Sequence, residues 1–291
     1  MTKAIVLRAA AGAVWCVSLV AAQQAQPAPA AGQQAAPAAG APVAKQPKVK
    51  SQKEGEAVMA VFNASDPASR IKAVDELLVK FADTEFKAVA LQVAAASAQQ
   101  NNDFEKMMLY SERALEADPQ NYQAMLMMAA GLAQRTREFD LDREEKLGRS
   151  EKLARDAMGI LKTAPKPNPQ ITDEQWDGAK RDLEAQAHEA LALGALVRKK
   201  YDLAIAEFKL AVEGASNPDP ATMVRLGAAY NMAGKHDEAI AVLDKLMAVP
   251  DLHPTIRQFA QAEKVRAAQA KSGGAKPAAS PAPAQVEIKK P

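Results

Sequence analysis

Aromatic residues, cysteine and long apolar runs are all scarce in this 291-residue chain. Phe, Trp and Tyr make up only 4% of the residues although 48% are hydrophobic, which favours Ala-rich helices over strands, because strands prefer aromatic and β-branched side chains. The lone cysteine, Cys16, excludes an internal disulfide framework and a cysteine-based zinc cluster. Beyond the N-terminus, no segment is apolar over the roughly 20 residues that a membrane-spanning helix needs.

The N-terminus has the pattern of a secretory signal peptide over residues 1–22. Lys3 and Arg8 supply the positive start, and residues 9–20 form a short apolar stretch. Small residues then lead to a predicted cleavage site after Ala22. The sequence therefore predicts a mature protein that is periplasmic or secreted.

Two alternatives to a cleaved signal peptide stay open. A retained membrane anchor is disfavoured, because the apolar stretch of twelve residues is shorter than a bilayer span requires. Lipidation of Cys16 is disfavoured because Trp15 stands directly before it, where a small residue is needed.

The formal net charge of +2 comes entirely from Lys3 and Arg8 of the predicted signal peptide. Without them the chain has 35 basic and 35 acidic side chains. Within it, residues 54–272 hold 28 Lys and Arg against 34 Asp and Glu. This acidic body disfavours a nucleic-acid partner, which would require a basic patch or stripe.

Two low-complexity segments flank that body. In residues 23–53, 22 of the 31 residues are Ala, Pro or Gln, and residues 273–291 have a similar composition. Such segments bury too little apolar surface to offset the entropy of ordering, so both are predicted to be disordered. Both are basic towards their ends, so a weak contact with an anionic envelope surface is an alternative role. The bases at the end of the first segment are Lys45, Lys48, Lys50 and Lys53.

A helical repeat is clearest in residues 220–253. Gly227 and Ala239 are small enough to let two helices approach closely, and Gly234 permits the turn between them. Around them lie Leu226, Tyr230, Leu243 and Leu246. This unit resembles the tetratricopeptide repeat, a helix-turn-helix of 34 residues, although His236 stands where that family usually has an aromatic residue.

Four further units resemble the same repeat with decreasing clarity, and a final helix follows the last unit. The resemblance implies an all-α fold, an α-solenoid of about five helix pairs with a C-terminal capping helix, flanked by the disordered tails. The units lie near residues 54–87, 88–121, 122–168, 185–219 and 220–253, with the cap at 254–271.

The middle of the chain departs from the repeat pattern. An insertion around residues 136–150 is expected to delay the second helix of its unit until about Ala154. The proline-rich residues 165–170 cannot be helical. Thr172 and Gln175 then form a capping box that starts a long helix through Val197.

Trp176 lies in the first turn of that long helix. We expect it to hold its own loop on the scaffold, with a role as a binding hot spot as the alternative.

No pattern of catalytic or metal-binding residues emerges. Asp140, Asp142, Glu144 and Glu151 imitate a calcium-binding loop, but Glu145 stands where the sharp turn needs glycine. His188, His236 and His253 lack metal-ligand spacing, and no phosphate-binding loop or nucleophile elbow is present. The sequence thus predicts no enzyme activity, no metal site and no cofactor, with a cryptic hydrolase as an unfavoured alternative.

The resemblance also implies a concave groove lined by the first helix of each unit. The side chains that it places there are mostly uncharged, which suits an uncharged peptide or an amphipathic helix of a partner protein. The predicted groove residues are Gln92, Ala96, Gln99, Leu126, Ala130, Gln134, Glu189, Leu193, Leu196, Val224, Ala228, Asn231 and Met232.

Family members that bind the carboxylates of a partner's C-terminus use Lys, Arg and Asn in this groove. The chain has Ala96, Ala130, Leu193 and Ala228 at the asparagine position, so that carboxylate clamp is absent. The predicted function is a non-catalytic protein-interaction scaffold of the bacterial envelope.

The groove hypothesis predicts that Leu126→Asp or Val224→Asp abolishes partner capture without changing the thermal melt. Two other roles stay open besides the hydrolase: a structural tether that acts through the tails, and self-assembly through the groove or by swapping of residues 136–170. The identity of the partner is not encoded in any recognisable motif.

Overall fold

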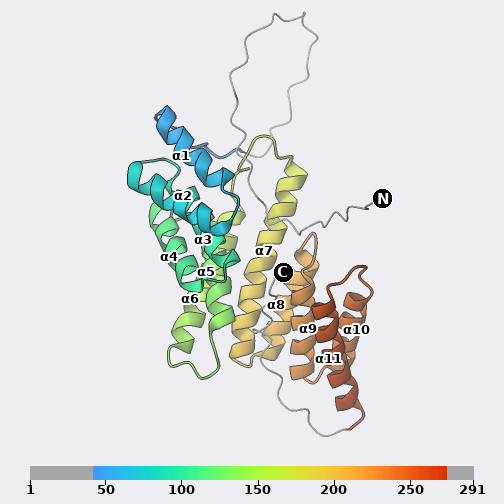
Figure 1. Ribbon diagram of the computed structural model, residues 1–291. Coiled ribbons are helices and arrows are strands. Elements are labelled where there is room, and N and C mark those ends of the chain that lie inside the picture. The colour runs from blue at the N-terminus through green and yellow to red at the C-terminus, as the bar shows by residue number, and fades with distance from the viewer. Residues whose placement is uncertain (1–41, 274–291) are drawn as a thin grey trace, which may run out of the picture. The chain divides into compact units, whose positions relative to one another are not determined.

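The structure is a computed structural model that describes residues 42–273 (Figure 1). The predicted signal peptide, residues 23–41 of the predicted linker and residues 274–291 of the tail lie outside the described residues.

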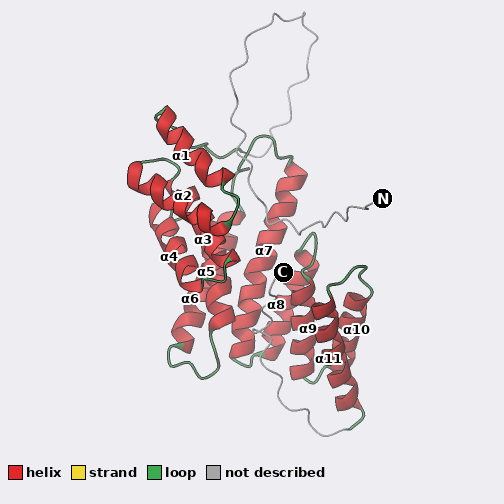
Figure 2. Cartoon of the chain, viewed as in Figure 1, coloured by secondary structure: helices red, strands yellow, loops and turns green. Residues whose placement is uncertain are grey.

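Helices make up the regular structure of the described residues, and loops connect them (Figure 2). The helices of residues 42–273 are α1 (Gln52–Asn63), α2 (Pro67–Lys80), α3 (Lys87–Gln100), α4 (Phe104–Ala117), α5 (Tyr122–Arg135), α6 (Arg143–Leu161), α7 (Asp173–Val197), α8 (Tyr201–Gly214), α9 (Pro220–Met232), α10 (His236–Met247) and α11 (Pro254–Lys271).

Each helix packs against the next one along the chain, from α1 through α11. The odd-numbered helices also touch one another in part, since α5 contacts both α3 and α7, and α9 contacts α11. This is the contact pattern of stacked helix pairs, in which each pair packs only on its neighbours. The predicted all-α solenoid is confirmed, and α11 packs on α9 and α10 at its end.

Short polar side chains start many of these helices. Each accepts a hydrogen bond from a backbone N–H of the first turn, which has no partner within the helix. Asp66 caps α2 in this way, and Thr172 and Gln175 form both hydrogen bonds of the predicted capping box of α7. The long helix α7 ends at Val197, as expected.

The insertion in the third pair is shorter than expected. Helix α6 begins at Arg143, so only residues 136–142 form a loop, and the expected resumption near Ala154 is wrong. The early start has a physical cause: Leu147 is fully buried, and the Ser150 hydroxyl donates to the Ala129 carbonyl of α5 at 2.7 Å. These contacts hold the charged first turns of α6 against the core.

The end of the predicted disordered linker is also ordered. Residues 42–46 run beside the proline-rich loop, where the Ala44 N–H donates to the Lys166 carbonyl and the Lys166 N–H donates to the Pro42 carbonyl, both at 2.7 Å. Lys50 then pairs with Asp83 at 2.7 Å, before α1 begins at Gln52. Composition gave no sign of these contacts because their partners lie far away in sequence.

Trp176 holds the proline-rich loop on the scaffold, as expected. Its ring is almost fully buried, and its Nε1 donates to the Ala164 carbonyl at 3.2 Å. The indole thereby fixes the non-helical segment between α6 and α7.

Gly227 supplies the close helix contact predicted from the repeat pattern. A Cβ at this position of α9 would lie 2.8 Å from Cγ of Leu243, which is fully buried in α10. We expect Gly227→Ala to lower the free energy of unfolding by about 1–2 kcal/mol, because overpacking outweighs the better helix propensity of alanine.

Gly159→Ala is the matched control for this prediction. Gly159 is exposed in the last turn of α6, with no atom within 4 Å of the Cβ that alanine would add. The same substitution should stabilise there by up to about 1 kcal/mol. Urea denaturation of both variants measures the difference, and equal shifts would contradict the close approach of α9 and α10.

Candidate functional site

The predicted groove residues divide into two groups by exposure. On α3 and α5, five of them are exposed or half-buried, and all five are uncharged. Gln92 of α3 also hydrogen-bonds to Gln123 of α5, which joins the two helices on this face. We call this surface the amide face; its predicted residues are Gln92, Ala96, Gln99, Ala130 and Gln134.

A second group of the predicted groove residues is buried within the chain, so these cannot present side chains to a partner. Leu126 is 3% exposed and Val224 6% exposed, within the same hydrophobic cluster. The groove assignment is corrected at these positions. The buried residues are Leu126, Leu193, Val224, Ala228 and Asn231.

Helix α9 explains most of this correction. Every residue from Thr222 to Ala229 is buried, because α8, α10 and α11 all pack against this helix. The Asn231 amide donates to the Glu263 carbonyl of α11 at 2.9 Å and to the Glu263 carboxylate at 3.0 Å. The capping helix therefore occupies part of the surface that the repeat pattern assigned to a partner.

Glu189 of α7 forms an ion pair with Arg225 of α9. Both side chains are largely buried, and no hydrogen-bond partner of Arg225 Nε is found among the described residues. Burial raises the pKa of the Glu189 carboxyl, while the Arg225 guanidinium acts in the opposite direction. Through this ion pair, Glu189 links the helices α7 and α9 of two repeats.

Arg225 was missed from the sequence, although a signal was available. Glu189 is the only acid among the predicted groove residues, and a buried carboxylate requires a counter-ion. Arg225 follows it by 36 residues, about one repeat further along. Residues one repeat apart on first helices are the natural place to seek such a partner.

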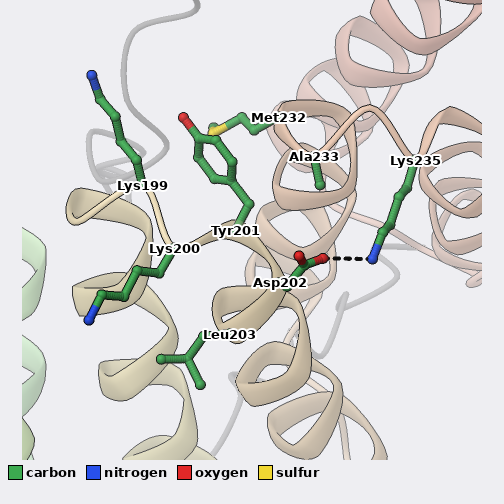
Figure 3. Close-up of a pocket in the computed structure, with 8 residues that line it drawn as sticks. All are labelled: Lys199, Lys200, Tyr201, Asp202, Leu203, Met232, Ala233 and Lys235. Atoms are coloured by element: carbon green, nitrogen blue, oxygen red, sulfur yellow. Dashed lines mark hydrogen bonds and ion pairs between the residues drawn. The ribbon is translucent and has the colours of Figure 1, made fainter.

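Met232 and Leu196 stay half-buried at the C-terminal ends of α9 and α7. Met232 lines an open pocket of about 540 Å³ between the α7–α8 turn and the α9–α10 turn (Figure 3). Lysines and apolar side chains share its lining, and Lys235 pairs with Asp202 at 2.7 Å. We call this the lysine pocket; its residues are Lys199, Lys200, Tyr201, Asp202, Leu203, Met232, Ala233 and Lys235.

Comparisons with known proteins agree with this architecture at the level of the fold. No protein-family profile matches the chain, and no curated protein matches its sequence. The crystal structure of TTC0263, a thermophilic tetratricopeptide repeat protein of Thermus thermophilus, aligns with 73% of this chain and 99% of its own at a TM-score of 0.50 and 15% identity. The chain has a tetratricopeptide-like fold.

Two further solved structures align at lower TM-scores. The assembly chaperone of RpL4 (Acl4) aligns at 0.42 with 14% identity, over 76% of this chain and 98% of its own. A tetratricopeptide repeat protein of Parabacteroides merdae ATCC 43184 aligns at 0.39 with 15% identity, over 77% and 94%. The fold assignment rests on TTC0263 and on the helix pairing.

In this tetratricopeptide-like fold, the four positions of the carboxylate clamp are apolar, and two of them are buried. Leu193 and Ala228 lie in the core, whereas Ala96 and Ala130 are half-buried on the amide face. None of these side chains can donate a hydrogen bond to a carboxylate.

The acids that imitate a calcium loop each have a basic partner. Asp142 pairs with Lys146 at 2.9 Å, and Glu144 accepts from Arg198 at 2.8 Å, which lowers the pKa of its carboxyl. Across residues 42–273, no group of three or more His, Cys, Asp or Glu side chains is arranged to hold a metal ion.

His188 of α7 and His236 of α10 each contact a polar side chain of the chain itself. His188 Nδ1 lies 2.7 Å from the Glu207 carboxylate of α8, and His236 Nδ1 lies 3.3 Å from the Asn231 amide oxygen. Separately, none of the described helices combines the length and the apolar character that a membrane span requires.

Proposed function

We propose that this chain is a protein-interaction scaffold without catalytic activity, and that the amide face of α3 and α5 binds an uncharged peptide or helix of a partner protein. The observation that carries this proposal is the exposure of uncharged first-helix side chains on two adjacent repeats. Stacked helix pairs commonly use such surfaces for binding.

The chemistry of the amide face defines the partner that it suits. Ala96 and Ala130 have short side chains, so a partner's backbone or helix can approach these positions closely. Gln99 and Gln134 supply both donors and acceptors without charge, and so suit amide and hydroxyl groups. An amphipathic helix or an extended polar segment meets these requirements.

The place of action is part of the same proposal. The signal-peptide pattern of residues 1–22 supports export of the chain, so we propose that the partner lies in the bacterial envelope. Fractionation of cells that produce the full chain would test this step, and a cytoplasmic, uncleaved chain would contradict it.

A double substitution on the amide face tests the binding role. Ala96→Glu with Ala130→Glu places two carboxylates on the amide face. An uncharged partner that docks there would remove water from both charges without pairing them, so partner capture should fall at least tenfold. The unfolding midpoint should move little, because both positions are partly exposed. The measurement is photo-crosslinking in the producing cells from a photo-reactive residue at position 99, followed by quantification of the crosslinked partner.

Ala206→Glu is the matched control, since Ala206 is an exposed alanine of the second helix α8. It should leave crosslinking from Gln99 unchanged. Equal crosslinking by the double variant and the control would rule out the amide face as the binding surface.

A further inference from the structure

The last helix, α11, has an exposed face without charge. Phe259 and Val265 on this face are 38% and 43% exposed. The terminal helix of a stack of helix pairs normally keeps a polar outer face in water. We call this surface the end face; its exposed residues, which follow helical spacing, are Gln258, Phe259, Gln261, Ala262, Val265 and Gln269.

Charged side chains of α11 are used on the other side of the helix. Lys264 pairs with Asp244 of α10 at 2.5 Å, and Lys271 pairs with Asp237, also of α10. The basic residues of α11 therefore hold it on the last helix pair and leave the end face uncharged.

The chain leaves α11 by the same turn that joins the two helices of a pair. After α3, α7 and α9, one residue has a positive φ, and a second helix begins two residues later. The N–H of this residue bonds to the carbonyl three residues earlier, and the N–H before it bonds to a carbonyl four residues earlier. The three residues are Asn102, Lys199 and Gly234.

Gly273 makes this turn at the end of α11. Its φ is 72°, its N–H bonds to the Ala270 carbonyl, and the Ser272 N–H bonds to the Ala268 carbonyl. The chain beyond Gly273 therefore leaves α11 in the direction that a second helix takes.

The end face lies where a second helix packs in the complete pairs. Counted back from the turn, the position of Ala262 corresponds to His188 in α7, which contacts Glu207 of the second helix α8 at 2.7 Å. The position of Val265 corresponds in the same way to Leu226 in α9, which is only 4% exposed. In α11 both positions are exposed, so the place of a second helix is vacant among the described residues.

An extended segment suits this place better than a helix. Where the two helices of a pair approach closely, the first helix has a small buried residue, whereas α11 has Arg266 at that position. Residues 277–286, PAASPAPAQV, contain three prolines, which prevent a regular helix, and no charge. The small residues of the other first helices are Ala95, Ala192 and Gly227.

The end face also has the chemistry that an extended proline-rich segment needs. A polyproline II segment makes no internal hydrogen bonds, so its carbonyls are free to accept from glutamine amides of the end face. Phe259 supplies an aromatic surface for proline rings. Ten residues in this conformation span about 31 Å, close to the length of about 27 Å for the 18 residues of α11.

We propose that residues 275–288 of the chain fold back along α11 and cover the end face as an extended proline-rich segment, in the place of a second helix. Phe259 lies about 21 Å from Gly273 along the helix, which about seven extended residues cover, so Pro281 reaches its ring. This contact closes the C-terminal end of the stack. It leaves the amide face free, so the inference does not depend on the proposed partner.

Photo-crosslinking in the purified full chain tests this contact. From a photo-reactive residue at position 262, the crosslinked peptides mapped by mass spectrometry should come from residues 275–288. Position 206, an exposed alanine of α8, is the matched control and should not crosslink to them. Equal crosslinking from both positions would overturn the inference, as would crosslinks from position 262 to another segment, the proline-rich residues 23–41 included.

A mixture of isotopically labelled and unlabelled chains distinguishes a segment of the same molecule from that of a second copy. The crosslinked peptides should be wholly labelled or wholly unlabelled. Pairs of mixed label would show that a second copy supplies the segment, and the fold-back within one chain would be overturned.

Protection from elastase gives an independent measurement. Elastase cleaves after alanine, so it should cut after Ala278 and Ala284 at least tenfold more slowly in the full chain than in a synthetic peptide of residues 275–291. Phe259→Asp with Val265→Asp should restore rapid cleavage, because covering the end face would then remove water from two unpaired carboxylates.

Val79→Asp is the matched control for these substitutions, because Val79 of α2 is 84% exposed and lies outside the end face. It should leave the protection unchanged. Cleavage of the full chain as fast as that of the peptide, as a freely moving tail predicts, or protection that the double variant retains, would contradict the proposed contact.

Discussion

Leu126→Asp is expected to lower the free energy of unfolding by about 4 kcal/mol or more. The side chain is 3% exposed in a cluster formed by α5 through α11, so the substitution loses apolar burial and places a carboxylate without a partner in the core. Val224→Asp should act in the same way from α9. Urea denaturation followed by circular dichroism measures both effects.

This expectation reverses the one drawn from the repeat pattern, in which the two substitutions leave the melt unchanged. Val79→Asp provides the control, because an apolar side chain that is already exposed should cost less than about 0.5 kcal/mol when replaced. If Leu126→Asp melted at the same temperature as Val79→Asp, the burial of α5 against its neighbours would be refuted.

Arg225→Met is expected to lower the free energy of unfolding by about 3 kcal/mol at neutral pH. The substitution keeps a long side chain in α9 but leaves the buried Glu189 carboxylate without its counter-ion. The remaining groups near Glu189 are Asp219, which repels it, and the Thr222 hydroxyl. Neither replaces the guanidinium.

The cost of Arg225→Met should depend on pH in a defined direction. Burial raises the pKa of the Glu189 carboxyl and the Arg225 guanidinium lowers it, so removal of Arg225 leaves the pKa in the folded variant higher than in the unaltered chain. The penalty is therefore complete above the folded-state pKa of the variant and disappears as the pH falls below the unfolded pKa of about 4.3. Denaturation of both chains from pH 7 down to pH 4 should show the difference shrinking.

Glu189→Gln combined with Arg225→Met is the control, because it removes both charges and leaves no unpaired ion. The double variant should recover most of the lost stability at pH 7, and its difference from the unaltered chain should vary little with pH. A double variant as unstable as Arg225→Met alone would show that the ion pair is not the cause.

The sequence predicted the architecture well because its signals were local. The capping box at Thr172, the turn at Gly234 and the close contact at Gly227 depend on residues within one helix pair, and each occurs where it was expected. The limits of the insertion were less accurate, because burial of Leu147 by another helix decides where α6 begins.

The candidate site was predicted only in part, because exposure is a property of the whole stack. The repeat pattern marks the same first-helix positions in every unit and treats them all as groove residues. In the structure, however, α3 and α5 leave uncharged side chains accessible, whereas α9 is buried between α8, α10 and α11. No periodic pattern distinguishes these two situations.

By itself, the sequence determined the class of fold, the repeat spacing and some helix ends, such as both ends of α7, since helix propensity, capping and turn residues act over a few neighbours. Tertiary structure alone decided which first-helix side chains reach solvent, that Glu189 pairs with Arg225, and that Phe139 and Leu141 are exposed. Those features depend on which distant helices pack together, and long-range packing rather than local preference sets both burial and charge pairing. The scarcity of aromatic residues has a counterpart in the packing, because a core rich in Ala and Leu lets the helices lie close together.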